Sequence, residues 1–246
     1  MNNTLHNGFR VLEFLADSGD AVSVKEIAEH FKLPNSHICR LLKSLTELGY
    51  AEQLASNRKY RVSLKILNLA NARLRKERLL ELSRPYMRQL VEKLDAPVYV
   101  TRIYCGYSLI IAVEYPVLSS HSNAVVIGAL HPPTDSACGK VCAAYATDDA
   151  RQELLERIDW NAPGDFQNRR MDFEDELMLI RRRGWALRTH PDVGAVAVPL
   201  FEKHDRITGA LGIMLSPGRL DNEEEKRSII ETAFACSKLI SMTMEK

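Results

Sequence analysis

Apolar residues recur at helical spacing in three short segments between residues 8 and 45. The second segment begins after Ser23, whose hydroxyl is expected to cap a helix, and Glu26 stands where a capping-box partner would be. A short turn then leads to Pro34, a residue favoured at the first position of a helix. The third segment spaces its apolar residues at intervals that place them on one helical face: Ile38, Leu41, Leu42 and Leu45. The pattern predicts three helices, the last two joined by a tight turn.

The opposite face of the third helix is polar and basic. Two helices around a tight turn, the second with such a face, are typical of a helix-turn-helix. Residues 51–54 and 58–62 predict a β-hairpin, or wing, whose basic tip is suited to phosphates or a minor groove. A small helical bundle with a solvated basic face is the alternative, and the order of the elements favours DNA binding. The residues expected to contact DNA are Ser23, Asn35, Ser36, His37, Arg40, Lys43, Ser44, Arg58 and Lys59.

Residues 64–94 are expected to be helical almost throughout. The first part of this segment carries one apolar stripe, formed by Ile66, Leu67, Ala70 and Leu74. A small winged domain cannot easily bury such a stripe alone, so packing against a second subunit is the favoured interpretation. A two-fold dimer would present two recognition helices to DNA. The alternative is that the stripe packs only within the chain.

The remainder of the chain mixes strand and helix patterns, which predicts an α+β fold. Strands are expected at residues 98–105, 108–115, 124–130, 185–189, 193–201 and 207–215, and helices at 136–146, 172–183 and 222–244. Hairpins with flanking helices indicate an antiparallel sheet with helices packed on it. The expected organisation is a winged helix-turn-helix DNA-binding domain at 1–64, a linker helix at 65–78, and an α+β domain at 79–246, which the family resemblance described below implies is an effector-binding and oligomerisation domain.

Composition and charge narrow the class of protein. A chain of 246 residues with 46% hydrophobic and 26% charged residues is typical of a soluble protein of two domains. No run of 18 apolar residues and no signal peptide occurs, so no membrane contact and a cytoplasmic location are expected. Neither the five cysteines nor the seven histidines show metal-ligand spacing, so no metal or cofactor is expected. Residues 1–78 hold 13 Lys and Arg against 8 Asp and Glu, and this basic balance suits nucleic acid.

These residues resemble the IclR family of transcription regulators. Residues 33–42 (LPNSHICRLL) and 45–50 (LTELGY) are similar to the family pattern LGLPKSTVHRLLxTLxxxGY, and 137–140 (ACGK) to its ALGK segment. Asn35 stands where the family often has Lys or Arg, and His37 where it often has Thr, so a relative's operator sequence does not transfer. The wing also lacks the family's glycine after its tyrosine-arginine pair. The resemblance implies a GAF-like C-terminal sensor for small, often carboxylated metabolites, and a dimer or dimer of dimers.

A turn that leads into the helix at residue 136 is the candidate effector site. The first amides of a helix attract anions, so those of Ala137 and Cys138 are expected to bind a carboxylate. Gly212 and Met214 replace serines of several relatives, which favours an effector with an apolar or aromatic portion, such as an organic or aromatic acid. Asp135 would repel an anion unless it points away, and helix capping is the alternative role for it and for its neighbour. The residues expected to contact the effector are His131, Thr134, Ser136, Ala137 and Cys138 and, as the resemblance to the family implies, Asp192, Ala195, Gly212 and Met214.

Two other functions compete with this interpretation. In an enzyme, Cys138 would be a nucleophile activated at a helix N-terminus, with His131 or His190 as its base. No catalytic or nucleotide-binding motif accompanies these residues, and a buried cysteine that packs like a small apolar residue is favoured. The second competitor is a ligand-independent DNA-binding protein. The sequence therefore predicts a DNA-binding regulator that is not an enzyme and whose partners are a double-stranded DNA operator and a small-molecule effector.

Overall fold

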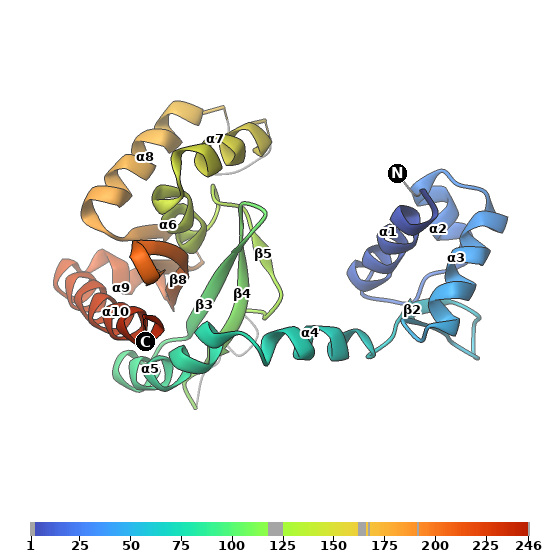
Figure 1. Cartoon of the computed structure of the whole chain (residues 1–246), viewed down its shortest axis with the longest axis horizontal. Coiled ribbons are helices and arrows are strands. Elements are labelled where there is room, and N and C mark those ends of the chain that lie inside the picture. The colour runs from blue at the N-terminus through green and yellow to red at the C-terminus, as the bar shows by residue number, and fades with distance from the viewer. Residues whose placement is uncertain (1–2, 118–124, 162–165, 167, 191, 246) are drawn as a thin grey trace. The chain divides into compact units, whose positions relative to one another are not determined.

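The computed structural model divides the chain into two compact units, which are described separately. It describes residues 3–117, 125–161, 166, 168–190 and 192–245. The N-terminal unit comprises residues 1–76 and the C-terminal unit residues 77–246 (Figure 1). Within the described residues, no helix combines the length and the apolar character needed to cross a bilayer.

The N-terminal unit is a winged helix-turn-helix. The expected capping box is present: the Glu26 amide donates to Ser23 Oγ at 3.2 Å, and the Ser23 amide donates to Glu26 Oε2 at 2.6 Å. Pro34 lies one residue outside its helix, with ψ of 141°, so the helix begins at Asn35 rather than at the proline. The elements are α1 (Asn3–Asp17), α2 (Val24–Phe31), α3 (Asn35–Glu47), the antiparallel strands β1 (Ala51–Gln53) and β2 (Tyr60–Val62), and α4 (Ile66–Leu74).

The segment 64–94, expected to be helical almost throughout, consists of two helices, because the chain is not helical at residues 75–77. Helix α4 ends at Leu74, and α5 (Arg78–Leu94) begins after Glu77, whose backbone is extended. The side chain of Glu77 is buried and its Oε1 lies 2.9 Å from Arg102 Nη2. A break in the helix allows this carboxylate to pair with a strand of the C-terminal unit, a contact that sequence periodicity does not reveal.

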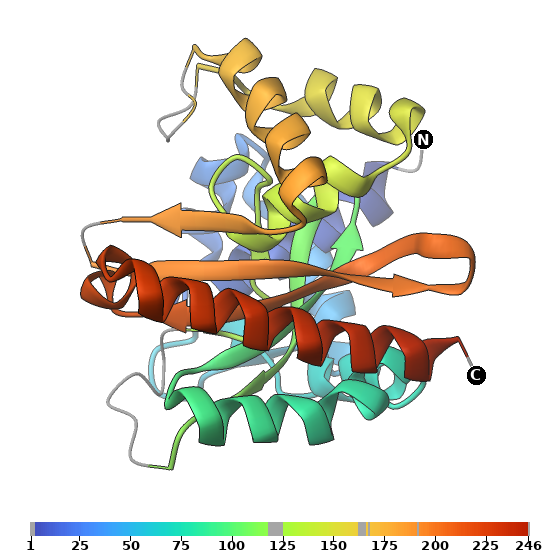
Figure 2. The same ribbon diagram turned by 90° about the vertical axis from the view of Figure 1, so that its left-hand side faces the viewer.

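The C-terminal unit is a six-stranded antiparallel sheet between two layers of helices. Helices α5 and α10 lie on one face, and α6 packs on the other with α8 beside it (Figure 2). The strand order is β5-β4-β3-β8-β7-β6. The strands are β3 (Val98–Tyr104), β4 (Tyr107–Glu114), β5 (Leu130–His131), β6 (Ala186–Thr189), β7 (Gly194–Glu202) and β8 (Arg206–Leu215), and the helices after α5 are α6 (Ala137–Tyr145), α7 (Asp148–Arg157), α8 (Arg170–Arg183), α9 (Pro217–Asp221) and α10 (Glu223–Met244). The expected α+β fold is confirmed.

Three elements of this unit differ from expectation. The strand expected at 124–130 is reduced to β5; residue 124 is outside the described residues, and Gly128, with φ of 93°, belongs to a turn that precedes the strand. Helix α7 was not expected, because only Leu154 and Leu155 of its ten residues are buried and its sequence is mostly charged. The short helix α9 was also not expected; it lies between the last strand, β8, and the final helix, α10.

Helix α6 lies close to the sheet because its side chains are small. Every residue from Ala137 to Ala144 is buried, and most are alanine, glycine or cysteine. The sheet beneath is equally tight: a Cβ added to Gly209 would lie 1.9 Å from the Thr101 carbonyl oxygen, and backbone cannot yield as a flexible side chain can. The sheet therefore requires glycine where β8 pairs with β3.

We expect Gly209→Ala to destabilise the C-terminal unit by about 2–3 kcal/mol or more, since overpacking costs about 1–3 kcal/mol and this overlap involves backbone. The matched control is Gly218→Ala, where no heavy atom lies within 4 Å of an added Cβ. Both tryptophans, Trp160 and Trp185, belong to the C-terminal unit, so urea denaturation followed by tryptophan fluorescence reports on that unit. Equal midpoints for the two variants would contradict the steric interpretation.

Candidate DNA-binding face and effector site

The polar face of α3 is exposed in the N-terminal unit. Asn35, Ser36, Arg40, Lys43 and Ser44 are exposed, whereas the apolar residues of the opposite face are buried. The helix therefore presents to solvent the residues that the sequence placed there.

His37 is partly buried and joins this face to α1. Its Nδ1 lies 3.2 Å from Arg40 Nη2, and its Nε2 lies 3.4 Å from Asn7 Nδ2. Lys43 forms an exposed ion pair with Glu47, at 3.8 Å. Exposed ion pairs contribute little to stability, and their anion is easily exchanged for another, so Lys43 remains available to phosphates.

The wing is attached to α2 through Lys59. Its Nζ lies 3.5 Å from Glu26 Oε2, the carboxylate that also completes the capping box of Ser23. Arg58 is exposed beside it and has a φ of 57°. Ser23 and Lys59 thus have partners within the protein, whereas Arg58 extends from the tip of the hairpin. Because one carboxylate serves both the cap and the wing, the position of the hairpin depends on α2.

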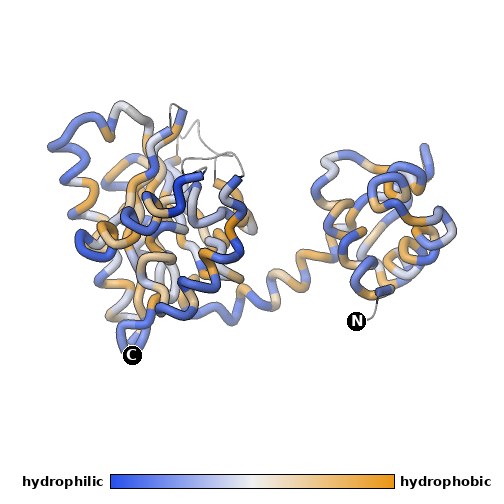
Figure 3. Tube along the Cα trace, turned by 90° about the horizontal axis from the view of Figure 1, so that it is seen from above, coloured by the Kyte–Doolittle hydropathy of each residue, from blue (hydrophilic) through white to orange (hydrophobic). Residues whose placement is uncertain are grey.

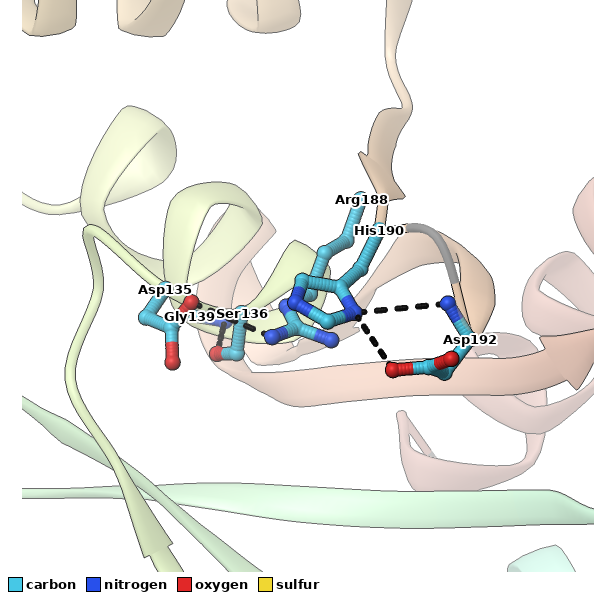
Figure 4. A network of polar contacts seen from close by, with 6 residues as sticks. All are labelled: Asp135, Ser136, Gly139, Arg188, His190 and Asp192. Carbon is cyan, nitrogen blue, oxygen red and sulfur yellow. Dashed lines mark hydrogen bonds and ion pairs between the residues drawn. The ribbon is translucent and has the colours of Figure 1, made fainter. Parts of the chain in front are cut away.

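Two neighbouring residues of the turn before α6, Ser136 and Asp135, have different roles. Ser136 caps α6, since its Oγ accepts from the Gly139 amide at 2.9 Å. Asp135 does not cap the helix: its Oδ1 lies 3.3 Å from Arg188 Nη2 on β6 (Figure 4). The capping alternative therefore describes Ser136 but not its neighbour. Ala137 and Cys138 follow, both 1% exposed.

The strands beside this turn form an apolar floor. Arg188 pairs with Ala195 of β7, and Ala195 pairs with Met214 of β8, so these three residues lie in a row across the α6 side of the sheet. Gly212 lies on the same side, but Tyr99 covers it: an added Cβ would lie 2.3 Å from Tyr99 Cζ. Gly212 therefore makes room for the tyrosine ring rather than forming an open wall.

Three expected residues remain: Asp192, His131 and Thr134. They lie at the edge of the cluster, which is the turn before α6 together with Arg188, Ala195 and Met214. Asp192 is exposed in the loop after β6, where its amide donates to His190 Nδ1 at 3.4 Å (Figure 4). His131 is partly buried, and this burial lowers its pKa; Asp135 opposes the shift and Arg188 adds to it. These opposing effects place Asp135 and Arg188 in the electrostatic environment of His131. Thr134 is partly buried in the turn itself.

Sequence reasoning missed Arg188 and Tyr99. Arg188 is a charged residue in a short strand, and only the register shows that it lies on the α6 side of the sheet. Tyr99 stands between Val98 and Val100, where the pattern reads as a buried strand without chemistry. In each case the sequence carried one weak signal of a functional residue, a polar side chain within a run of apolar residues.

The environment of Cys138 is that of a structural thiol. Burial raises its pKa to about 12, although hydrogen bonds with Tyr99 and Thr101 oppose the shift. A thiol with such a pKa is protonated at neutral pH, whereas a nucleophilic cysteine needs a lowered pKa. Cys142, one helical turn later, is also buried and its pKa is also raised. These two cysteines pack as small apolar residues.

Comparisons with known proteins agree with this description of both units. Residues 4–55 match the IclR helix-turn-helix domain, and residues 71–242 match the bacterial transcriptional regulator IclR C-terminal domain. The chain is 24% identical over 252 residues to the DNA-binding transcriptional repressor YiaJ of Escherichia coli K12, covering 99% of this chain and 89% of that protein.

Solved structures show the same fold. An IclR family transcriptional regulator from Brucella abortus superposes with a TM-score of 0.83 at 24% identity, over 99% of this chain and 92% of that one. An IclR homologue from Microbacterium hydrocarbonoxydans, crystallised in complex with 4-hydroxybenzoate, gives a TM-score of 0.77 at 19% identity, over 98% of each chain. The winged N-terminal unit, the helix-covered sheet and the two family matches together show that the chain belongs to the IclR family of bacterial transcription regulators, and not to a class of enzymes.

Proposed function

We propose that this regulator binds a double-stranded DNA operator through α3 and the wing, and that a small organic or aromatic acid bound beside α6 controls its activity. The observation that carries the DNA-binding part is the exposed face of α3 in a winged helix-turn-helix. Such a helix enters the major groove, where Arg40 has the reach and donors to read a guanine edge. Asn35, Ser36, His37, Lys43 and Ser44 complete the face, Arg58 and Lys59 contact phosphate or the minor groove, and Ser23 lies at the start of the supporting helix.

A homodimer is the form in which we propose that the protein binds its operator. No residue of α4 is buried among the described residues, and Leu67 and Leu69 are about half exposed. Apolar and polar residues alternate along this helix (Figure 3). An apolar groove in the N-terminal unit runs from Leu5 and Phe9 of α1, past Leu48, to α4. A second copy would cover these residues and supply the second recognition helix of a two-fold operator. A dimer of dimers would use the C-terminal unit as well.

The cluster beside α6 supports control by an acid. Arg188 supplies a cation, the first turn of α6 supplies backbone amides, and Ala195 and Met214 supply an apolar floor. The solved relative in complex with 4-hydroxybenzoate binds a ligand that combines a carboxylate with an apolar ring. We propose the same chemical class here, with Ser136 acting through its cap, His131 and Thr134 at the rim, and Asp192 in the adjoining loop. Gly212 and Cys138 act indirectly, by seating Tyr99.

The signal would reach DNA through the linker. Arg102 of β3 holds Glu77 where α5 begins, and β3 also carries Tyr99 of the cluster. An effector that shifts β3 would therefore change the direction of the chain between α4 and α5 and the spacing of two recognition helices in a dimer. Coupling between two sites is typically about 1–3 kcal/mol, or roughly 5–150-fold in affinity.

We expect Arg40→Ala to weaken operator binding by about 1–3 kcal/mol and to relax the preference for one base pair, because Arg40 reads a base edge. Lys59→Gln should weaken binding evenly across sequences and lower the salt slope by about one, because a phosphate contact carries no sequence information. Binding is measured by fluorescence anisotropy on DNA selected from a random pool by the wild-type protein. The control is Arg227→Gln, an exposed arginine of α10. If Arg40→Ala behaves like the control, α3 is not the reading helix.

We expect an acid of the proposed class to stabilise the C-terminal unit and to change operator affinity. A thermal-shift screen of benzoate, 4-hydroxybenzoate and aliphatic carboxylates tests this, since a ligand at 100 times its Kd adds about 2.7 kcal/mol to the free energy of unfolding. Operator binding is then measured with and without the acids that give a shift. A change of roughly 5–150-fold is expected. No change with any stabilising acid would instead indicate a ligand-independent DNA-binding protein.

A further inference from the structure

The guanidinium of Arg188 is only partly paired. Its Nη2 contacts Asp135 Oδ1 at 3.3 Å, while its Nε is buried and has no hydrogen-bond partner among the described residues. A buried donor without a partner is unfavourable, and a charged donor more so. A guanidinium satisfies a carboxylate best through two parallel N–H donors, and Asp135 accepts from one nitrogen only. The geometry at Arg188 is therefore suited to a second, better-placed anion.

The existing contact with Asp135 is weak enough to be displaced. The 3.3 Å distance is long for a charge-assisted hydrogen bond, and the Asp135 side chain is 44% exposed. Partly exposed ion pairs typically contribute less than about 1 kcal/mol. Asp135 also belongs to a turn, between Pro133 and Ser136, so its side chain can rotate into solvent without moving a strand. An entering anion would lose little by separating the pair.

The surroundings of Arg188 define the rest of the ligand. Ala195 and Met214 continue the row of side chains from Arg188 across β7 and β8, and neither supplies a hydrogen-bond donor. A ligand whose charged end meets Arg188 would lay its body over this apolar floor. The match is a monocarboxylate with a ring or an alkyl chain, and not a dicarboxylate or a sugar acid with several hydroxyls.

We propose that Arg188 binds the carboxylate of the effector and that Asp135 is the resident counter-ion which the effector displaces. This inference rests on the proposed function, because it names the cation of the same site. Asp135 thereby sets the concentration at which the regulator responds: it competes for the guanidinium and repels the incoming anion, so only an acid with sufficient apolar contact displaces it. A neutral analogue of the same shape has nothing to exchange for Asp135.

The test uses benzoate as the probe and benzamide as its neutral analogue, with the full-length protein. Binding is measured by calorimetry for the wild type, Asp135→Asn, Arg188→Gln and Arg188→Lys. The control is Asp148→Asn, which removes the carboxylate of another Asp–Arg pair, with Arg151, on α7 outside the cluster. We expect Asp135→Asn to bind benzoate about tenfold more tightly than the wild type and the control to match the wild type.

Arg188→Gln should reduce the affinity for benzoate by about tenfold or more. The affinity of Arg188→Lys should lie between those of the wild type and Arg188→Gln, because lysine keeps the charge but not the two-donor fork. The affinity for benzamide should be the same in the wild type and in every variant. The proposal is overturned if Asp135→Asn binds benzoate no better than the wild type, or if Arg188→Gln binds it equally well. Failure of Arg188→Gln to fold leaves Asp135→Asn and Arg188→Lys as decisive.

An imidazole titration checks that the variants keep the cluster intact. Asp135 opposes the lowering of the His131 pKa and Arg188 contributes to it. Asp135→Asn should therefore lower the His131 pKa further and Arg188→Gln should raise it, as followed by NMR. Opposite directions would show that the pair does not lie beside His131 in solution.

The outcomes also separate this inference from the proposed function. If an acid changes operator affinity but its binding is the same in Asp135→Asn and Arg188→Gln, effector control stands and Arg188 is not its cation. If Asp135→Asn binds benzoate through Arg188 but no acid changes operator affinity, the anion site stands and effector control fails.

Discussion

An ion pair between buried Glu77 and partly buried Arg102 fixes the point where the chain enters the C-terminal unit. Arg102 also donates to the Thr208 carbonyl at 3.2 Å, so one guanidinium joins the start of α5, strand β3 and strand β8. Removal of one partner from such a pair leaves a desolvated charge, which is far more costly than the pair's net contribution. The contact ties the start of α5 to the sheet. The arginine is on the same strand as Tyr99, whose ring seats α6.

Local patterns predicted the elements, and long-range contacts decided what the side chains do. Ser23 and Glu26 are three residues apart, so the capping box could be predicted from sequence, as could the face of α3. Asp135 and Arg188 are 53 residues apart in the chain. Their contact depends on the register of β6 against β7 and on the path of the turn before α6, neither of which hydrophobic periodicity specifies. For the same reason, the contact of Glu77 at the break could not be predicted, because its partner is an arginine on a strand 25 residues later.

The cluster beside α6 shows what a comparison with the family pattern could not predict. Gly212 was expected to leave the wall less polar than in relatives that have a serine there. The structure fills the space beside Gly212 with the Tyr99 ring, whose own pKa burial raises well above its usual range. A missing serine is thus partly replaced by a buried phenol from the neighbouring strand. In a tightly packed sheet, the polarity of a wall depends on what crosses from the next strand as well as on the residue at a given position.

The five cysteines divide in a way that bears on redox chemistry. Cys138, Cys142 and Cys236 are buried, and burial raises the pKa of each, whereas Cys39 and Cys105 are exposed. Oxidants and alkylating reagents act on accessible thiolate, so they reach the surface cysteines before the three buried ones. Cys39 lies on α3 between His37 and Arg40. Oxidation of the cysteines would therefore begin at Cys39 and Cys105, one in each unit, while the three buried thiols remain intact.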